Sequence, residues 1–168
     1  MEPLRWKKTV WKLSVSEQDF GSVDAEQVKT SETGSISPTA FINLPHPRAL
    51  AFLGDAVYEI FLREWAVELH GKAQSKDLHG FTVKLARATA QVALLHYLQP
   101  SLTEQELEVI RQGRNIGVGV SRRSEQATHR QATGFEALLG ALHLQQPQRL
   151  QALFQLAKPF LQAHWEQS

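Results

Sequence analysis

Apolar residues recur every three to four positions along most of the chain from Pro47 onward, which is the period of an α-helix. The alternating β-branched runs that are typical of strands are absent from the sequence. The pattern predicts five helices, at residues 47–69, 75–98, 103–112, 125–144 and 147–165. Thr103 followed by Glu106 is a capping-box pattern, and Pro147 suits the first turn of a helix. We therefore expect an all-α fold.

The first 44 residues differ from the rest of the chain. They mix Ser, Thr, Gly, Glu and Gln without sustained periodicity, and residues 30–38 have the composition of a flexible linker. We expect residues 1–44 to form a flexible or disordered leader and residues 45–168 to form one folded domain. The alternative is a short docking element in the leader, built around Trp6 and Trp11.

Composition narrows the function classes. The chain has 168 residues, of which 42% are apolar, and this is enough for one domain with a real core. It has no cysteine, which excludes disulfides and thiolate metal sites. The net charge of +1 gives no global field that would attract nucleic acid, so any polyanion must bind to a local patch. With no long apolar run and no secretory signal in the sequence, we expect a cytoplasmic protein.

Three carboxylates interrupt segments that are otherwise apolar. Asp55 and Glu59 lie one helical turn apart in the run 49–62, and Glu136 lies in the run 134–142. Burying an unpaired carboxylate costs several kcal/mol, so such a group normally keeps a cation, a proton or a donor beside it. Carboxylate oxygens suit Mg²⁺ or Mn²⁺, and the three acids therefore suggest a shared divalent cation. The alternative is ion pairing with Arg or Lys of neighbouring helices.

Gly54, directly before Asp55, lies inside a predicted helix, where glycine costs about 1 kcal/mol relative to alanine. This cost is tolerable if the backbone of another helix packs closely against it.

A basic segment runs from Arg111 to Arg130 and contains a single acid, Glu125. The planar fork of Arg suits phosphate, and glycines at positions 113, 117 and 119 would let a backbone approach closely. The segment predicts phosphodiester contacts near the carboxylates, through Arg114, Asn115, Arg122, Arg123 and Arg130. The alternative is a solvated charged loop.

Two runs carry a resemblance to a known family. The run AFLGDAVYE (51–59) resembles the signature helix of the ribonuclease III catalytic domain, in which an apolar pair and Gly precede a metal-binding Asp. The run TGFEALLGALHL (133–144) is similar to the family's second acidic helix, whose Glu falls on Glu136. The run RQGRN (111–115) and the basic segment are similar to the Mini-III branch, whose members consist of the catalytic domain alone.

The resemblance covers roughly residues 47–160, with two departures. Ordinary members of the family have Glu at the position of Ala51 and Asp at the position of Thr133, and the Mini-III branch resembles this sequence at both. With Asp55 and Glu136 as the remaining pair, more of a metal's shell must be water and RNA phosphate. No double-stranded RNA-binding domain is expected, so the catalytic domain must grip the duplex, chiefly through the arginine segment.

The resemblance implies a homodimeric, Mg²⁺-dependent endoribonuclease that cuts both strands of an RNA duplex and leaves 5′ phosphates. Mn²⁺ would substitute for Mg²⁺. Asp55 and Glu136 would be the catalytic, metal-binding residues, with Glu59 in a supporting position at the metal. The branch implies maturation of the large-subunit ribosomal RNA precursor. Phe52, Leu53 and Val57 are expected in the dimer interface, or alternatively in the core.

Two non-enzymatic functions also fit an all-α chain of this kind. A non-catalytic RNA-binding scaffold would explain the carboxylates that are missing at Ala51 and Thr133, but it would not explain the presence of Asp55 and Glu136. A helical protein-interaction domain would pair the acids with cations and would leave the arginine segment unexplained.

Overall fold

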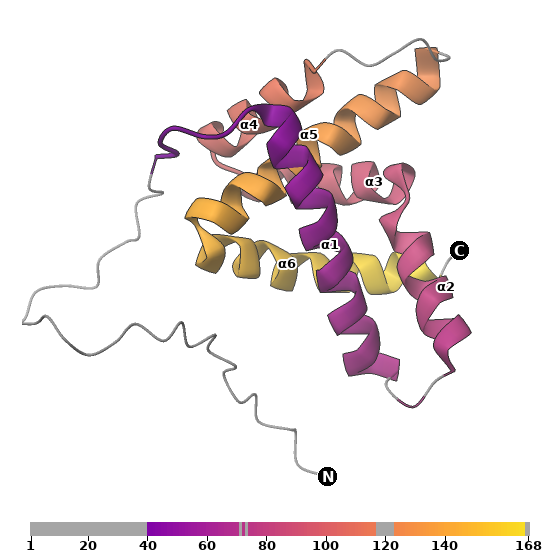
Figure 1. Ribbon diagram of the computed structural model, residues 1–168. Coiled ribbons are helices and arrows are strands. Elements are labelled where there is room, and N and C mark those ends of the chain that lie inside the picture. Colours follow the sequence, from indigo (N-terminus) through magenta and orange to yellow (C-terminus); the bar gives the residue numbers. More distant parts are fainter. Residues whose placement is uncertain (1–39, 71, 73, 117–122, 167–168) are drawn as a thin grey trace, which may run out of the picture. The chain divides into compact units, whose positions relative to one another are not determined.

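A computed structural model describes residues 40–70, 72, 74–116 and 123–166, with the backbone alone described at 123–125. These residues form α-helices and a short 3-10 helix without strands, so the all-α prediction is confirmed (Figure 1). The elements are α1 (Pro47–His70), α2 (Ser75–Ala86), α3 (Ala88–Leu98), η1 (Gln99–Ser101), α4 (Glu104–Arg114), α5 (Arg123–Gln145) and α6 (Pro147–Glu166). No helix in this part of the chain is long and apolar enough to cross a membrane.

Residues 41–44, which the sequence predicts to be part of the leader, contact the folded domain. Phe41 and Leu44 pack against the hydrophobic core. The backbone N–H of Ile42 donates to Gln145 Oε1 at 3.0 Å, and Gln145 Nε2 donates to the Ile42 carbonyl at 2.6 Å. This segment is therefore held to the end of α5. The rest of the predicted leader, residues 1–39 with Trp6 and Trp11, lies outside the described residues.

The predicted helix over residues 75–98 is two helices, so that prediction was wrong. The chain breaks at Arg87, whose backbone is extended (φ −62°, ψ 145°). Carbonyls at the end of α2 find partners from other helices, since Tyr58 Oη donates to the Leu85 carbonyl at 3.2 Å and Gln91 Nε2 to the Ala86 carbonyl at 3.2 Å. These tertiary hydrogen bonds stabilise the break without a helix-breaking residue. The sequence therefore has no Pro or Gly at this point that would have predicted it.

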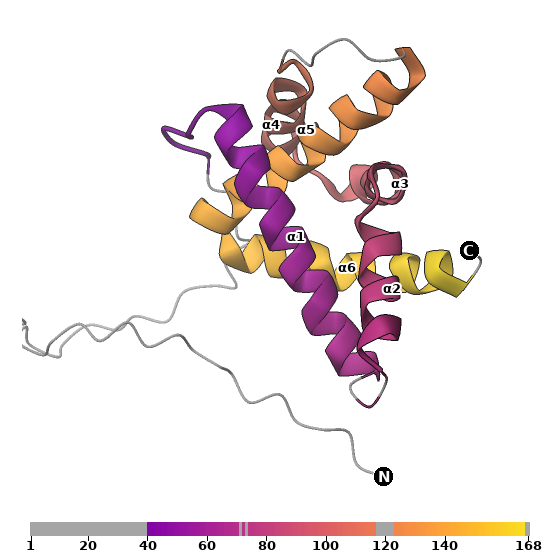
Figure 2. The ribbon, with the colours of Figure 1, turned by 45° about the vertical axis from the view of Figure 1, so that its right-hand side comes forward.

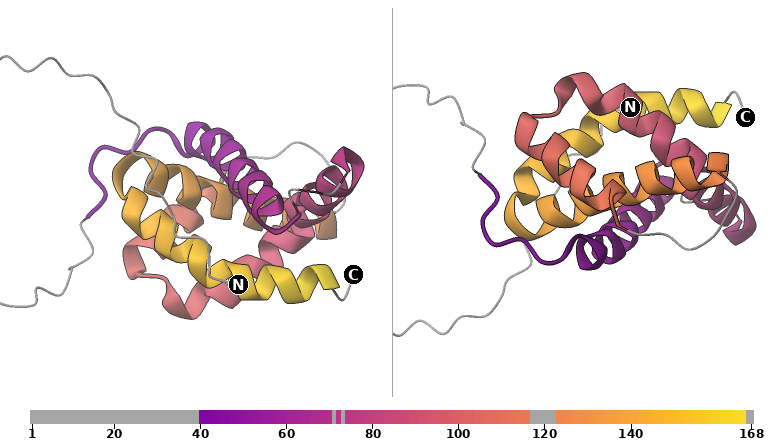
Figure 3. Two further views of the ribbon diagram at one scale, coloured as in Figure 1. Left: turned by 90° about the horizontal axis from the view of Figure 1, so that it is seen from below. Right: turned by 90° about the horizontal axis from the view of Figure 1, so that it is seen from above.

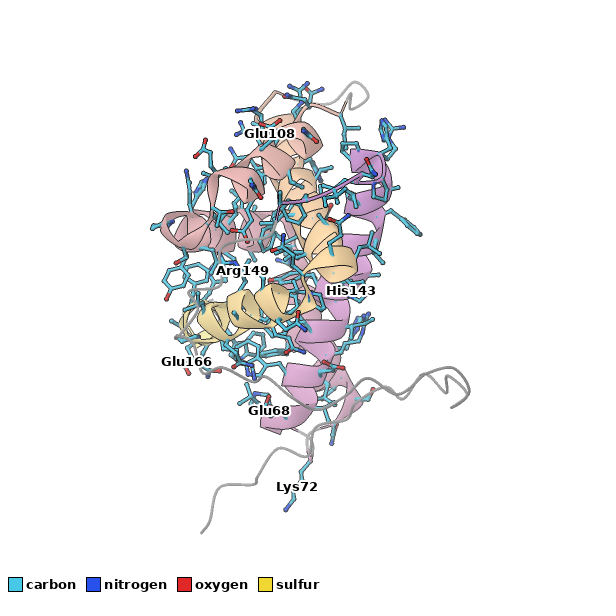
Figure 4. The ribbon with its side chains drawn as sticks, turned by 90° about the vertical axis from the view of Figure 1, so that its left-hand side faces the viewer. Glu68, Lys72, Glu108, His143, Arg149 and Glu166 are labelled. Atoms are coloured by element: carbon cyan, nitrogen blue, oxygen red, sulfur yellow. The ribbon has the colours of Figure 1, made fainter. Side chains whose placement is uncertain are left out.

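The predicted capping box opens α4. The Thr103 N–H donates to Glu106 Oε2 at 2.8 Å, and the Glu106 N–H donates to Thr103 Oγ1 at 3.3 Å. Glu106 is buried and also accepts from Arg149 of α6, at 2.7 Å from Nε and 2.9 Å from Nη2. Arg149, labelled in Figure 4, donates in addition to the Ser101 carbonyl at 2.6 Å. The bidentate pair ties α6 to the start of α4.

Helix α5 runs through the middle of the domain and packs against α1, α3, α4 and α6 (Figures 2 and 3). Glycine brings α1 and α5 into backbone contact, because a Cβ atom built on Gly54 would lie 1.8 Å from the Glu136 carbonyl oxygen. A Cβ atom on Gly140 would lie 2.1 Å from the Leu50 carbonyl oxygen. The close approach expected at Gly54 is confirmed, and it brings the two acidic helices together.

Candidate active site

Asp55 and Glu136 come together where α1 crosses α5. Asp55 follows the glycine that touches the Glu136 backbone, and its negative charge raises the pKa of the Glu136 carboxyl. Two predicted site residues, 81 positions apart in the sequence, therefore share one electrostatic environment.

Burial is the largest influence on Glu136. The pKa of its carboxyl is raised to about 7, first by loss of solvent and then by the charge of Asp55, while a hydrogen bond from the Gln91 side chain opposes the shift. The pKa of Asp55 is also raised, first by partial burial and then by the charge of Glu59. No Lys, Arg or His of the described residues forms an ion pair with Asp55 or Glu136. Within this part of the chain, the ion-pair alternative fails for these two acids.

The two acids are less buried than the apolar segments around them suggest. Asp55 is exposed and Glu136 is half-buried. The cause lies on the outer face of α1, where Phe52 and Ala56 are exposed as well, so that this helix is not covered on all sides. The acids therefore lie at a surface that a substrate can reach.

Glu59 forms an ion pair with Arg63. Its carboxylate accepts from Arg63 Nη1 at 2.6 Å, one turn further along α1. Among the residues that the structure describes, no group of three or more His, Asp or Glu side chains is arranged to hold a metal ion. The structure thus brings together two of the three predicted metal-binding acids and pairs the third with Arg63.

A residue that sequence reasoning missed is Gln91 of α3. Its side chain is 2% exposed, hydrogen-bonds to Glu136, and also donates from Nε2 to the Ala86 carbonyl. Its Oε1 finds no donor among the described residues. The available signal was a glutamine within a mostly apolar stretch, ATAQVALL, at residues 88–95.

The predicted phosphate-binding residues fall into two groups. Arg114 and Asn115, at the end of α4, and Arg130 of α5 are exposed. A Cβ atom on Gly134 would lie 2.7 Å from Arg114 Cγ, so the stem of Arg114 crosses α5 two residues before Glu136. Arg122 and the side chain of Arg123 lie outside the described residues.

Gly113 was expected, with Gly117 and Gly119, to let a backbone approach closely. At Gly113 the backbone that approaches is that of α5, since a Cβ atom would lie 2.9 Å from Gly134 Cα and 2.8 Å from Ala137 Cβ. Gly113 therefore packs α4 against α5. The other two glycines lie outside the described residues.

Comparison with known families decides what these helices belong to. Residues 48–147, which contain both acids and the α1–α5 crossing, match the model of the ribonuclease III domain. The chain belongs to the ribonuclease III family.

The relatives of the chain show which branch of the family it belongs to. A Mini-ribonuclease 3 from Symbiobacterium thermophilum is 46% identical over 123 residues, which are 72% of this chain and 93% of that protein. A Mini-ribonuclease 3 from a Synechococcus species is 48% identical over 121 residues, 71% of this chain and 85% of that protein. The chain is therefore an endoribonuclease of the Mini-III branch of the ribonuclease III family, a family that acts on double-stranded RNA.

The fold has a counterpart among solved structures. The crystal structure of a protein from Fusobacterium nucleatum matches with a TM-score of 0.62 at 21% identity. The match covers 75% of this chain and 99% of that one. At this identity the match bears on the fold alone.

The two departures from ordinary ribonuclease III enzymes have clear local structures. Ala51 is buried, so its methyl group is part of the α1 core contact. Thr133 is half-buried, and its hydroxyl donates to the His129 carbonyl one turn earlier at 2.9 Å. The hydroxyl oxygen keeps its capacity to accept from a water.

Four large apolar side chains of α1 are exposed. Phe52 is 84% exposed, Val67 59%, Ile60 55% and Leu69 44%. Leu53 is half-buried and Val57 belongs to the core. Of the residues expected in a dimer interface, Phe52 is therefore free to contact a partner, whereas Val57 is used within the domain.

Proposed function

We propose that the enzyme cleaves double-stranded RNA with Mg²⁺ held by Asp55 and Glu136. The observation that carries this proposal is the meeting of two carboxylates at a glycine-mediated helix crossing, without a cationic side chain of the described residues paired with them. Both carboxyls have raised pKa values, so the ionised pair is unfavourable by itself and a divalent cation would stabilise it.

The donor set fits a hard divalent ion. Carboxylate oxygens are preferred ligands of Mg²⁺ and Mn²⁺, and Mg²⁺ readily keeps several waters, so two protein ligands suffice. The buried Oε1 of Gln91, which lacks a donor among the described residues, offers an acceptor for such a water. When bound, the ion lowers the pKa of a coordinated water and stabilises negative charge on the scissile phosphate.

The two acids contribute differently. Exposed Asp55 is accessible to a phosphate from solvent, whereas Glu136 is half-buried in the crossing. Because the pKa of Glu136 is about 7, its carboxyl must release a proton before it ligates the ion, and metal binding therefore weakens below neutral pH. Glu59 contributes less to metal binding, because its carboxylate already pairs with Arg63 and would contact the ion only through a water.

We propose that the duplex is held by Arg114, Asn115, Arg122, Arg123 and Arg130. The stem of Arg114 over α5 and the exposure of Arg130 support phosphate contacts beside the acids. A-form RNA offers its phosphates and 2′-hydroxyls to such side chains, so shape is recognised more than sequence.

We further propose that the enzyme is a homodimer that meets its partner through Phe52 of α1. An exposed aromatic ring beside the site supports a two-fold contact that sets two active sites against one duplex. The resemblance to the Mini-III branch supports a cytoplasmic enzyme that matures the large-subunit ribosomal RNA precursor.

A cleavage assay tests the function. We expect an end-labelled RNA duplex to be cut on both strands in Mg²⁺ or Mn²⁺, to stay intact in EDTA, and to yield 5′ phosphates. The same strand without its complement should resist cleavage.

Replacing Arg114 and Arg130 with Ala should weaken duplex binding in EDTA. The slope of log K against log salt should fall by roughly 0.9 for each phosphate that the variant no longer neutralises.

Three results would contradict parts of this proposal. Duplex that is bound but uncut in Mg²⁺ would indicate an RNA-binding scaffold. An unchanged salt slope would remove Arg114 and Arg130 from the RNA interface. A large-subunit ribosomal RNA precursor that stays intact under conditions where a generic duplex is cut would exclude it as the substrate.

A further inference from the structure

Gln91 is the one glutamine of α3, and its side chain is 2% exposed. A buried amide needs hydrogen-bond partners for two N–H groups and for its oxygen. Gln91 Nε2 donates to the Ala86 carbonyl at 3.2 Å, and the side chain also hydrogen-bonds to the Glu136 carboxylate. Nε2 thus has a carbonyl acceptor, the side chain lowers the pKa of the Glu136 carboxyl as a hydrogen-bond donor does, and Oε1 has no donor among the described residues.

The two acceptors fix the orientation of this amide. If the amide were turned over, Oε1 would face the Ala86 carbonyl and the Glu136 carboxylate, both of which are acceptors. Such an arrangement loses two hydrogen bonds and sets three oxygens against one another, so it is strongly disfavoured. The amide is therefore held with Nε2, and not Oε1, toward these two acceptors, and Oε1 stays open to a donor.

The break between α2 and α3 makes this arrangement possible. In a continuous helix the Ala86 carbonyl would accept from the backbone four residues later, at Ala90. The extended conformation of Arg87 frees that carbonyl, and Gln91 Nε2 donates to it in place of the Ala90 backbone N–H. The break thus anchors one side of the amide and leaves the other side for Glu136.

We propose that Gln91 is a positioning residue of the metal site. Its Nε2 holds the Glu136 carboxylate in one orientation, and its Oε1 accepts a hydrogen bond from a water in the Mg²⁺ shell. This inference rests on the proposed function, since it needs an ion at Asp55 and Glu136. Partners behind metal ligands set ligand orientation, and losing one typically weakens metal affinity about 10- to 100-fold.

The test compares Mn²⁺ affinity, read by electron paramagnetic resonance, in the wild type and in Gln91→Met, which keeps the length of the side chain and removes both polar functions. Thr82→Val is the matched control, because Thr82 is 7% exposed and its hydroxyl donates within α2 alone, to the Leu78 and His79 carbonyls. We expect Gln91→Met to weaken Mn²⁺ binding at least about tenfold. Thr82→Val should stay within about twofold of the wild type, and both variants should bind duplex normally in EDTA.

The outcomes separate this inference from the proposed function. If the wild type binds Mn²⁺ and Gln91→Met binds it equally well, Gln91 has no positioning function and the metal site stands. If the wild type binds no Mn²⁺ that depends on Asp55 and Glu136, the proposed function itself fails. A drop of equal size in Thr82→Val would show a general packing effect and would overturn the assignment.

A measurement on the unaltered protein covers the case in which Gln91→Met does not fold. The side-chain amide resonances of Gln91 should shift during a Mg²⁺ titration, with the midpoint found for metal-dependent cleavage. The amide of Gln112, which donates to Glu108 on the surface of α4 at 2.9 Å, should not move. A Gln91 amide that stays unchanged at saturating Mg²⁺ would overturn the proposal.

Discussion

At the scale of single residues, Glu136 keeps its proton to about pH 7 because burial and the charge of Asp55 both disfavour its ionised form. In the unfolded chain the same carboxyl releases its proton near pH 4.5. Between these values the folded protein binds more protons than the unfolded chain, so the metal-free fold loses stability as the pH rises. The ionised Glu136 carboxylate is thus unfavourable in the metal-free protein, and this ionised form is the one that could bind a cation.

Glu136→Gln should remove this pH dependence. Without metal, the free energy of unfolding of the wild type relative to the variant should fall by about 2 kcal/mol between pH 5 and pH 8, a value reduced for solvent screening at a half-buried group. Urea unfolding at several pH values, with EDTA present, measures the difference. Mg²⁺ should restore the wild type at pH 8 and leave the variant unchanged. A difference that is constant with pH would show that Glu136 ionises normally.

The sequence identified Asp55 and Glu136 because acids in apolar helical runs are conspicuous. Gln91 escaped detection, since a lone glutamine in a helix is ordinary and its importance depends on the break at Arg87. The sequence also suggested buried acids, whereas Asp55 is exposed. Periodicity shows that a segment is apolar, but it does not show which face of α1 is left uncovered.

At the scale of elements, the crossing of α1 and α5 sets the distance between the acids. The helices meet through Gly54 and Gly140, whose missing side chains let the backbones touch. The helical period predicted both elements well, since hydrophobic spacing determines them locally. It did not predict the division of α2 from α3. That break is stabilised by hydrogen bonds from Tyr58 of α1 and Gln91 of α3 to the last carbonyls of α2, which the pattern within α2 does not show.

Gly54→Ala should therefore separate the helices and disturb the acids. Its Cβ atom would lie 1.8 Å from the Glu136 carbonyl oxygen, so we expect a loss of about 3 kcal/mol in the free energy of unfolding. Gly80→Ala in α2 is the control, because nothing lies within 4 Å of its Cβ position and alanine favours a helix by about 0.5–1 kcal/mol.

Urea unfolding of both variants measures these changes, and duplex cleavage below the unfolding transition shows whether the acids have moved. The tight crossing would be refuted if Gly54→Ala were as stable and as active as Gly80→Ala.

At the scale of the whole molecule, the exposed ring of Phe52 lies on the same helix as Asp55, three residues earlier. A two-fold contact there would cover the outer face of α1 and bring a second active site alongside the first. The sequence suggested such a contact but included Val57, which the fold uses in its own core.

If the proposed homodimer forms through Phe52, Phe52→Ser should convert it to a monomer. Burying one Phe side chain contributes roughly 1.5–3 kcal/mol, and a two-fold interface loses two of them, so the dissociation constant should rise at least about 100-fold. Light scattering over a concentration series measures the change. Leu156→Ser is the control, because Leu156 is 45% exposed on α6, a different helix. If Phe52→Ser dimerises as the wild type does, the interface lies elsewhere.

In the proposed mechanism Asp55 and Glu136 hold the catalytic ion, and the decisive measurement is the rate of duplex cleavage at saturating Mg²⁺. Asp55→Asn and Glu136→Gln should each cut at least about 100-fold more slowly than the wild type, with folding and duplex binding retained, because a lost metal ligand removes the source of the activated water. Glu59→Gln, whose carboxylate pairs with Arg63, should stay within about tenfold of the wild type. Cleavage at the wild-type rate by Asp55→Asn or by Glu136→Gln would contradict the account.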